Sequence, residues 1–259
     1  MAMAEIVSSV LVKFPNAPLQ RQQVDIFRGF INEVNEWKND LFHNHKIDSI
    51  NGVIYRYPLI QFRAFEDAAA IWALQEGVGA LSQYLHQHSD NLPDTLLRYE
   101  WSPQKTIIEL EEKHRFYHLR NWLPFNKYRS FNGTTKDNWA EWKQAITLRE
   151  KTTLLERILT GQILDFCKNV GFRVPDKALI VEVTDFKIIT QDKYPTSNGS
   201  SLSFKVVNLC YRTNLILPEF IGLGKGKSKG FGWQTSSQYH TLPIFRTRHS
   251  ENLLFEFNF

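Results

Sequence analysis

Apolar and polar positions alternate through the first half of the chain in a pattern typical of a mixed α/β domain. Apolar, β-branched and aromatic residues predict strands over 6–14, 52–65, 68–74, 95–101 and 105–111, the last two separated by a turn at Ser102-Pro103. Apolar residues three and four positions apart predict a helix that Pro18 opens and a shorter helix containing Val78, Leu81 and Leu85. This order, β-α-β-β-α-β, is the ferredoxin-like arrangement.

The second half begins after a candidate linker at 126–138, which holds Gly133, Thr134, Thr135 and Lys136. Helical spacing follows over 139–146 and 154–170, and strand patterns cover 179–190 and 202–217. Helix followed by strands is consistent with a divergent copy of the first half, although no residue-level repeat supports a duplication. We therefore expect an α+β fold with domains at 1–130 and 138–259.

One stretch of the second half, 220–233, has an unusual composition. It reads F-I-G-L-G-K-G-K-S-K-G-F-G-W and holds five of the thirteen glycines of the chain, with three lysines spaced two apart. Glycine loses more conformational entropy on folding than any other residue, so we do not expect packing to require so many. Successive amides and ammonium groups favour an anion site, anchored at its far end by Phe231 and Trp233. A solvated loop without a ligand is the alternative.

A nucleotide-binding P-loop does not fit this stretch. That motif needs a glycine five residues before the one at Gly226, where this chain has Ile221, and it must run directly into a helix. Here Gly230-Phe231-Gly232 follows instead. A glycine- and lysine-rich loop between apolar strands suits a polymeric phosphate backbone such as RNA better.

The composition excludes several classes of protein. With 42% hydrophobic residues the chain can bury a core, and its longest apolar run, 68–74, is too short to span a membrane. The first residues lack the pattern of a signal peptide, and the two cysteines, Cys167 and Cys210, suit a reducing compartment. We expect a cytoplasmic protein that does not insert into membranes.

Charge is distributed unevenly along the chain. The net charge is only +4, but residues 66–112 contain nine acids and two bases, whereas residues 201–250 contain seven bases and one acid. A basic C-terminal region is the pattern expected of a protein that binds a polyanion.

A second candidate site is the tripeptide His43-Asn44-His45. In an extended segment, side chains two residues apart point the same way, so both imidazoles would face one site. Two histidines can supply a general base and a general acid at neutral pH, which RNA cleavage by attack of a ribose 2′-OH requires. Half of a metal site, or a polar turn without chemistry, are the alternatives.

These features together resemble the CRISPR repeat-processing endoribonucleases of the RAMP superfamily. The resemblance rests on a ferredoxin-like first half, a histidine after its first helix and a loop of the form G-x-G-x-G…G-F-G. The branch with a His-x-His shortly before Tyr-Arg-Tyr-Pro-Leu-Ile-Gln-Phe, here 55–62, is the most similar. The resemblance covers about residues 6–233.

The resemblance implies two tandem ferredoxin-like (RRM-like) domains and cleavage of precursor CRISPR RNA without a metal or cofactor. The products would carry a 5′-hydroxyl and a 2′,3′-cyclic phosphate, with His43 and His45 as the acid–base pair. Arg28 would face the same cleft, and bases could stack on Phe231 or Trp233. The loop residues expected against RNA are Gly222, Gly224, Lys225, Gly226, Lys227, Lys229, Gly230, Phe231 and Gly232.

A rival interpretation is a non-catalytic RNA-binding subunit of a CRISPR effector complex with the same fold, and a metal-dependent phosphodiesterase is a more distant one. The His43/His45 pair favours the enzyme. The expected partners are CRISPR repeat RNA and such a complex, with the protein as a monomer or homodimer. Family chains usually end soon after the loop, whereas this one continues to Phe259, and the role of 234–259 stays open.

Overall fold

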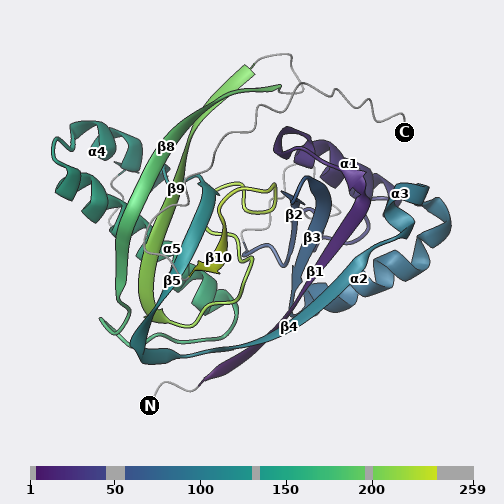
Figure 1. The fold of residues 1–259 in the computed structure, drawn as a ribbon, viewed down its shortest axis with the longest axis horizontal. Helices are drawn as coiled ribbons and strands as arrows, with labels where there is room; N and C mark the ends of the chain where they lie inside the picture. The colour runs from purple at the N-terminus through teal and green to yellow at the C-terminus, as the bar shows by residue number, and fades with distance from the viewer. Residues whose placement is uncertain (1–3, 45–55, 130–134, 196–200, 238–259) are drawn as a thin grey trace.

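The structure is a computed structural model that describes residues 4–44, 56–129, 135–195 and 201–237. Two four-stranded antiparallel sheets and their helices make up the α+β fold (Figure 1). The prediction of two tandem ferredoxin-like domains is confirmed.

The first domain contains the expected β-α-β-β-α-β order. Its strands lie in the order β2-β3-β1-β4 and all pair antiparallel. Its elements are β1 (Glu5–Pro18), η1 (Arg21–Gln23), α1 (Val24–Val34), β2 (Ile60–Phe65), β3 (Ala68–Leu74), α2 (Glu76–Gln87), η2 (Ser89–Asn91), α3 (Asp94–Leu97) and β4 (Glu100–Ile108).

The second domain repeats the spatial order of the first. Its sheet runs β10-β5-β9-β8, so in both sheets the order is fourth, first, third and second strand. Its elements are β5 (Leu110–Trp122), β6 (Lys127–Arg129), β7 (Thr135–Asp137), α4 (Asn138–Gln144), α5 (Leu148–Asn169), β8 (Val181–Pro195), β9 (Ser201–Leu215) and β10 (Trp233–Ser237). Residues 216–232, all of which the structure describes, connect the third strand to the fourth without a helix.

The division between the sheets differs from the expected one. It lies at Glu109, where β4 ends and β5 begins, and not in the segment 126–138. The two strands follow one another almost without interruption, so no turn residues or change in composition mark the boundary in the sequence. The turn expected at Ser102-Pro103 is absent as well, because Pro103 lies within β4, which is an edge strand and tolerates a missing amide donor.

Alternating side chains of the first sheet supply two hydrophobic cores. Val10, Val12 and Phe14 of β1 face α1, α2 and α3, which Figure 1 shows on the side of the sheet away from the second domain. Val7 and Leu11 face the other way and join a core with residues of α5 and the second sheet. The two domains therefore share a continuous core, in which apolar positions of α5 such as Leu155, Leu159 and Phe166 are buried.

Candidate functional site

The glycine-rich segment lies between the two sheets, beside β2 (Figure 1). Its two ends pair with each other: Leu223 donates its amide to the Gly232 carbonyl at 2.6 Å, and Phe220 donates to the Gln234 carbonyl at 2.8 Å. The tip between these ends, 224–230, rests on the edge of β2, where the Phe62 amide donates to the Ser228 carbonyl at 3.3 Å. The tip of a second-domain loop is thus held by the first domain.

Packing within the protein explains the glycines, contrary to the expectation from sequence. A Cβ at Gly232, where φ is +63°, would lie 1.9 Å from the Leu223 carbonyl oxygen. At Gly222 a Cβ would lie 2.5 Å from the Gln61 side-chain oxygen. Gly224, Gly226 and Gly230 also have positive φ. The glycines let the loop turn tightly against its neighbours, and any ligand meets what this packing leaves exposed.

The tip carries exposed lysines and several amides whose hydrogen-bonding capacity is not used within the described residues. Lys225 and Lys229 are exposed. The amides of Gly226, Lys227 and Ser228 have no hydrogen-bond acceptor in the described part of the chain. Unpaired amides beside ammonium groups form a site suited to phosphate oxygens.

Lys227 and Phe231 lie on the inner side of the loop. The Lys227 Nζ is 3.7 Å from an Asp165 carboxylate oxygen of α5 and 4.5 Å from the centre of the Tyr57 ring. Burial lowers the pKa of this ammonium, and Asp165 partly opposes the shift. Phe231 is 5% exposed beneath the Arg21 guanidinium, which is 4.8 Å from the ring centre. Neither it nor Trp233, 9% exposed, offers an open ring face for a base.

The helix α1 contacts the loop through its first turn. The Lys229 ammonium lies 3.3 Å from an Asp25 carboxylate oxygen, and Val24 packs against Gly230. Sequence reasoning did not single out Asp25, because an exposed acid in the first turn of a helix is ordinary.

His43 lies in a turn after α1 and not in an extended segment. The Asn44 amide donates to the Asp40 carbonyl at 2.8 Å, and Asn44 has a φ of +55°. His43 is 4% exposed, and its ring is tilted against that of Trp37, with Nε2 3.0 Å from the Trp37 carbonyl oxygen. A carbonyl only accepts, so Nε2 carries a proton and Nδ1 is the basic nitrogen of the neutral ring. His45 lies outside the described residues, and the expected shared face of the pair therefore stays a prediction.

Arg28 supports this turn. Its Nη2 donates to the His43 carbonyl at 3.0 Å. Burial lowers the pKa of the Arg28 guanidinium, and the nearby Asp25 carboxylate opposes that shift. Arg28 thus contacts the histidine turn, and its contact with RNA stays a prediction.

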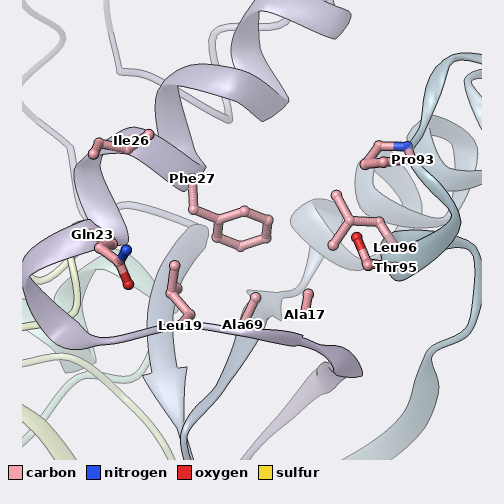
Figure 2. Close-up of a pocket in the computed structure, with 9 residues that line it drawn as sticks. All are labelled: Ala17, Leu19, Gln23, Ile26, Phe27, Ala69, Pro93, Thr95 and Leu96. Atoms are coloured by element: carbon pink, nitrogen blue, oxygen red, sulfur yellow. The ribbon is translucent and has the colours of Figure 1, made fainter. Parts of the chain in front are cut away.

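Several other features carry no candidate chemistry. Cys167 and Cys210 are buried thiols, and burial raises the pKa of each to about 12. An apolar hollow lies between β1, α1 and α3, lined by residues such as Leu19, Phe27 and Leu96, and none of the described residues that line it has a titratable side chain (Figure 2). Across the described ranges, no three His, Cys, Asp or Glu side chains gather as metal ligands would. No helix among those residues has the length and apolar character needed to cross a bilayer.

Two family models match the chain. Residues 6–101 match the Cas6b N-terminal domain, and residues 109–236 match the Cas6b C-terminal domain. Their boundary coincides with the division between the two sheets. This chain belongs to the Cas6b family. It is thus a member of the Cas6-type, repeat-processing branch of the RAMP proteins, as the motifs at 43–62 and 222–232 indicated.

Solved structures show the same fold. One described as "Crystal structure of Cas6b" has a TM-score of 0.72 at 19% identity and covers 90% of this chain and 100% of its own. "Crystal structure of CRISPR RNA processing endoribonuclease Cas6b" follows with a TM-score of 0.64, 17% identity and the same coverage. "Csf5, CRISPR-Cas type IV Cas6 crRNA endonuclease" has a TM-score of 0.53 at 12% identity, covering 90% of this chain and 99% of its own. No curated protein sequence matches the chain.

Proposed function

We propose that this Cas6b-family chain is an endoribonuclease that cuts CRISPR repeat RNA, with the tip 224–230 binding the RNA backbone. Membership of the family supports the activity, since structurally similar proteins are described as a CRISPR RNA processing endoribonuclease and a crRNA endonuclease. The exposed lysines of the tip, and its amides that have no acceptor within the described ranges, support the choice of a phosphate backbone as ligand.

The observation that carries the proposal is that α1 joins the two candidate sites. Asp25 of α1 pairs with Lys229 of the tip, and Arg28, one turn later, donates to the His43 carbonyl. Residues three apart on a helix are neighbours on its surface and are separated by about 4.5 Å along the axis. An RNA strand on the tip would therefore pass close to the histidine turn.

The chemistry we propose is internal transesterification. A histidine base removes the proton of a ribose 2′-OH, the 2′ oxygen attacks the adjacent phosphorus, and the 5′ oxygen leaves with a proton from a second histidine. The products are a 2′,3′-cyclic phosphate and a 5′-hydroxyl, and the step needs neither metal nor cofactor. We assign the acid–base pair to His43 and His45. Acid–base catalysis of this kind typically contributes about 10²–10⁴-fold.

A second candidate function is RNA binding without cleavage, as a subunit of a CRISPR effector complex. The burial of the His43 ring favours it, because a base must reach the proton that it removes. The expectations of a cytoplasmic location and of a monomer or homodimer stay predictions.

Cleavage of repeat RNA in EDTA separates these candidates. We would compare the wild type with His43→Ala and His45→Ala, and with His86→Ala, an exposed histidine of α2, as the control. Under single-turnover conditions each site variant should lose at least about 10²-fold in rate while the control keeps it. A 2′-deoxy nucleotide at the cut site should abolish cleavage. Tight binding of intact RNA by all four proteins would instead support the binding subunit.

A further inference from the structure

The hydroxyl group of Tyr57 uses its full hydrogen-bonding capacity in the interface between the two domains. It donates to the Gly222 carbonyl at 2.9 Å and accepts from the Gly222 amide at 3.1 Å and from Gln61 Nε2 at 3.0 Å. A phenol has one proton and two lone pairs, so every position is filled. The first domain thereby holds both backbone groups of the first glycine of the loop.

Two further first-domain side chains extend this contact. The Gln61 side-chain oxygen accepts from Arg63 Nη2 at 3.0 Å, and Arg63 Nη1 donates to the Phe220 carbonyl at 2.8 Å. The Arg63 guanidinium lies over the rings of Trp72 and Trp233, 5.8 and 5.9 Å from their centres. Among the described residues, no carboxylate lies within ion-pair distance of Arg63. The guanidinium therefore contacts Gln61, the loop backbone and the two rings.

Because the network is buried, its polar groups need their hydrogen-bond partners. Tyr57, Gln61 and Arg63 are each at most 2% exposed. Desolvation lowers the pKa of Arg63 to about 9, with the nearby Tyr57 opposing the shift, so the group stays cationic at neutral pH. A buried polar group that loses its partner is destabilising, so each of these side chains depends on the loop being in one place.

The network also accounts for Gly222. Any Cβ there would meet the Gln61 oxygen at 2.5 Å. The loop can therefore accept these hydrogen bonds only if its first residue has no side chain. The network fixes the base of the loop, 220–222, and the cationic tip begins two residues further on.

We propose that Tyr57, Gln61 and Arg63 are positioning residues that aim the tip of the loop at RNA. This inference rests on the proposed function of the loop. The three side chains touch no RNA themselves and act through the backbone at 220–222. Loosening that backbone should weaken RNA binding without slowing the chemical step once RNA is bound.

The test compares Tyr57→Phe with Tyr84→Phe. Tyr84 is a matched control, because it is also buried in the first domain and its hydroxyl has no hydrogen-bond partner in the described part of the chain. We would measure the Kd for repeat RNA, KM, kcat and Tm of each full-length protein. For Tyr57→Phe we expect Kd and KM to rise about tenfold, with kcat within about twofold of the wild type. Tyr84→Phe should leave Kd and KM unchanged.

Hydrogen exchange adds a measurement that would not change if Tyr57 contributed only to overall stability. Amides at 222–232 should exchange faster in Tyr57→Phe than in Tyr84→Phe at equal distance below each Tm. If Tyr57→Phe lowers only Tm, leaving Kd, KM and the exchange of 222–232 as in the control, the positioning role is wrong.

A second variant covers the case in which Tyr57→Phe does not fold. Gln61→Glu keeps an acceptor for Arg63 but removes the donors to the Tyr57 hydroxyl and the Pro58 carbonyl. The same rise in Kd and KM is expected, and its absence overturns the inference. Failure of the proposed function looks different, because then the wild type itself would neither bind nor cut repeat RNA.

Discussion

The two domains share one strand order but connect their third and fourth strands differently. In the first domain the connection contains α2, whose Leu81 and Leu85 pack on their own sheet. In the second domain the connection is the glycine-rich loop, which packs on the edge of β2 in the other domain. One connection completes a core, whereas the other builds an interface and leaves a cationic tip exposed. The equivalent connections of the two domains therefore have different structural roles.

The largest expected effect is on stability, when one glycine in each connection is replaced by alanine. Gly232→Ala places a Cβ against the Leu223 carbonyl at a positive φ and should lower the free energy of unfolding by at least about 3 kcal/mol. Gly79→Ala, in α2, meets no atom of the described residues within 4 Å and should raise it by about 0.5–1 kcal/mol. Urea unfolding measures both. Equal effects would show that the loop is not packed as described.

A smaller effect, on RNA binding, distinguishes a lysine of the tip from a lysine elsewhere on the surface. Lys225→Ala removes an exposed ammonium and should weaken RNA binding and reduce the slope of log K against log salt by about 0.7, the loss expected for one phosphate contact with single-stranded RNA. The control is Lys105→Ala, an exposed lysine of β4. Binding titrations between 50 and 200 mM salt, a range in which such contacts are sensitive, measure the slope. A control slope that falls as much as that of Lys225→Ala would contradict the assignment.

The smallest effect concerns the lysine that lies inside the loop. Burial lowers the pKa of Lys227, so between that lowered value and 10.5 the unfolded chain binds more protons than the folded one. Its contribution to stability therefore rises with pH through this window. Lys227→Met keeps the aliphatic stem and should reduce that rise, by less than about 1 kcal/mol, with RNA binding unchanged. Unfolding at pH 8 and pH 9.5 tests the first point, and a loss of RNA affinity equal to that of Lys225→Ala would contradict the second.

The periodicity of apolar residues predicted the helices and strands better than the spacing of lysines and motif residues predicted the site. Helical spacing predicted α1 and most of α5, since their apolar faces are decided locally. The expected start of the first helix was wrong, because Pro18 ends β1 and α1 begins at Val24. The lysines two apart were expected to act alike, but positive φ angles turn the backbone between them, and Lys227 points inward. The roles of Tyr57 and Gln61 depend on a partner at Gly222, far along the chain, which no local pattern reveals. The sequence identified their motif only as a family signature.

The most direct test of this account is hydrogen exchange of the full-length protein with and without repeat RNA. The amides of Gly226, Lys227 and Ser228 have no acceptor among the residues that the structure describes, so they should exchange quickly in the free protein. The account predicts that RNA protects peptides covering 224–230 and leaves those covering α2 unchanged. Saturating RNA that protects α2 or another surface, with no protection at 224–230, would contradict the claim that this loop is the RNA site.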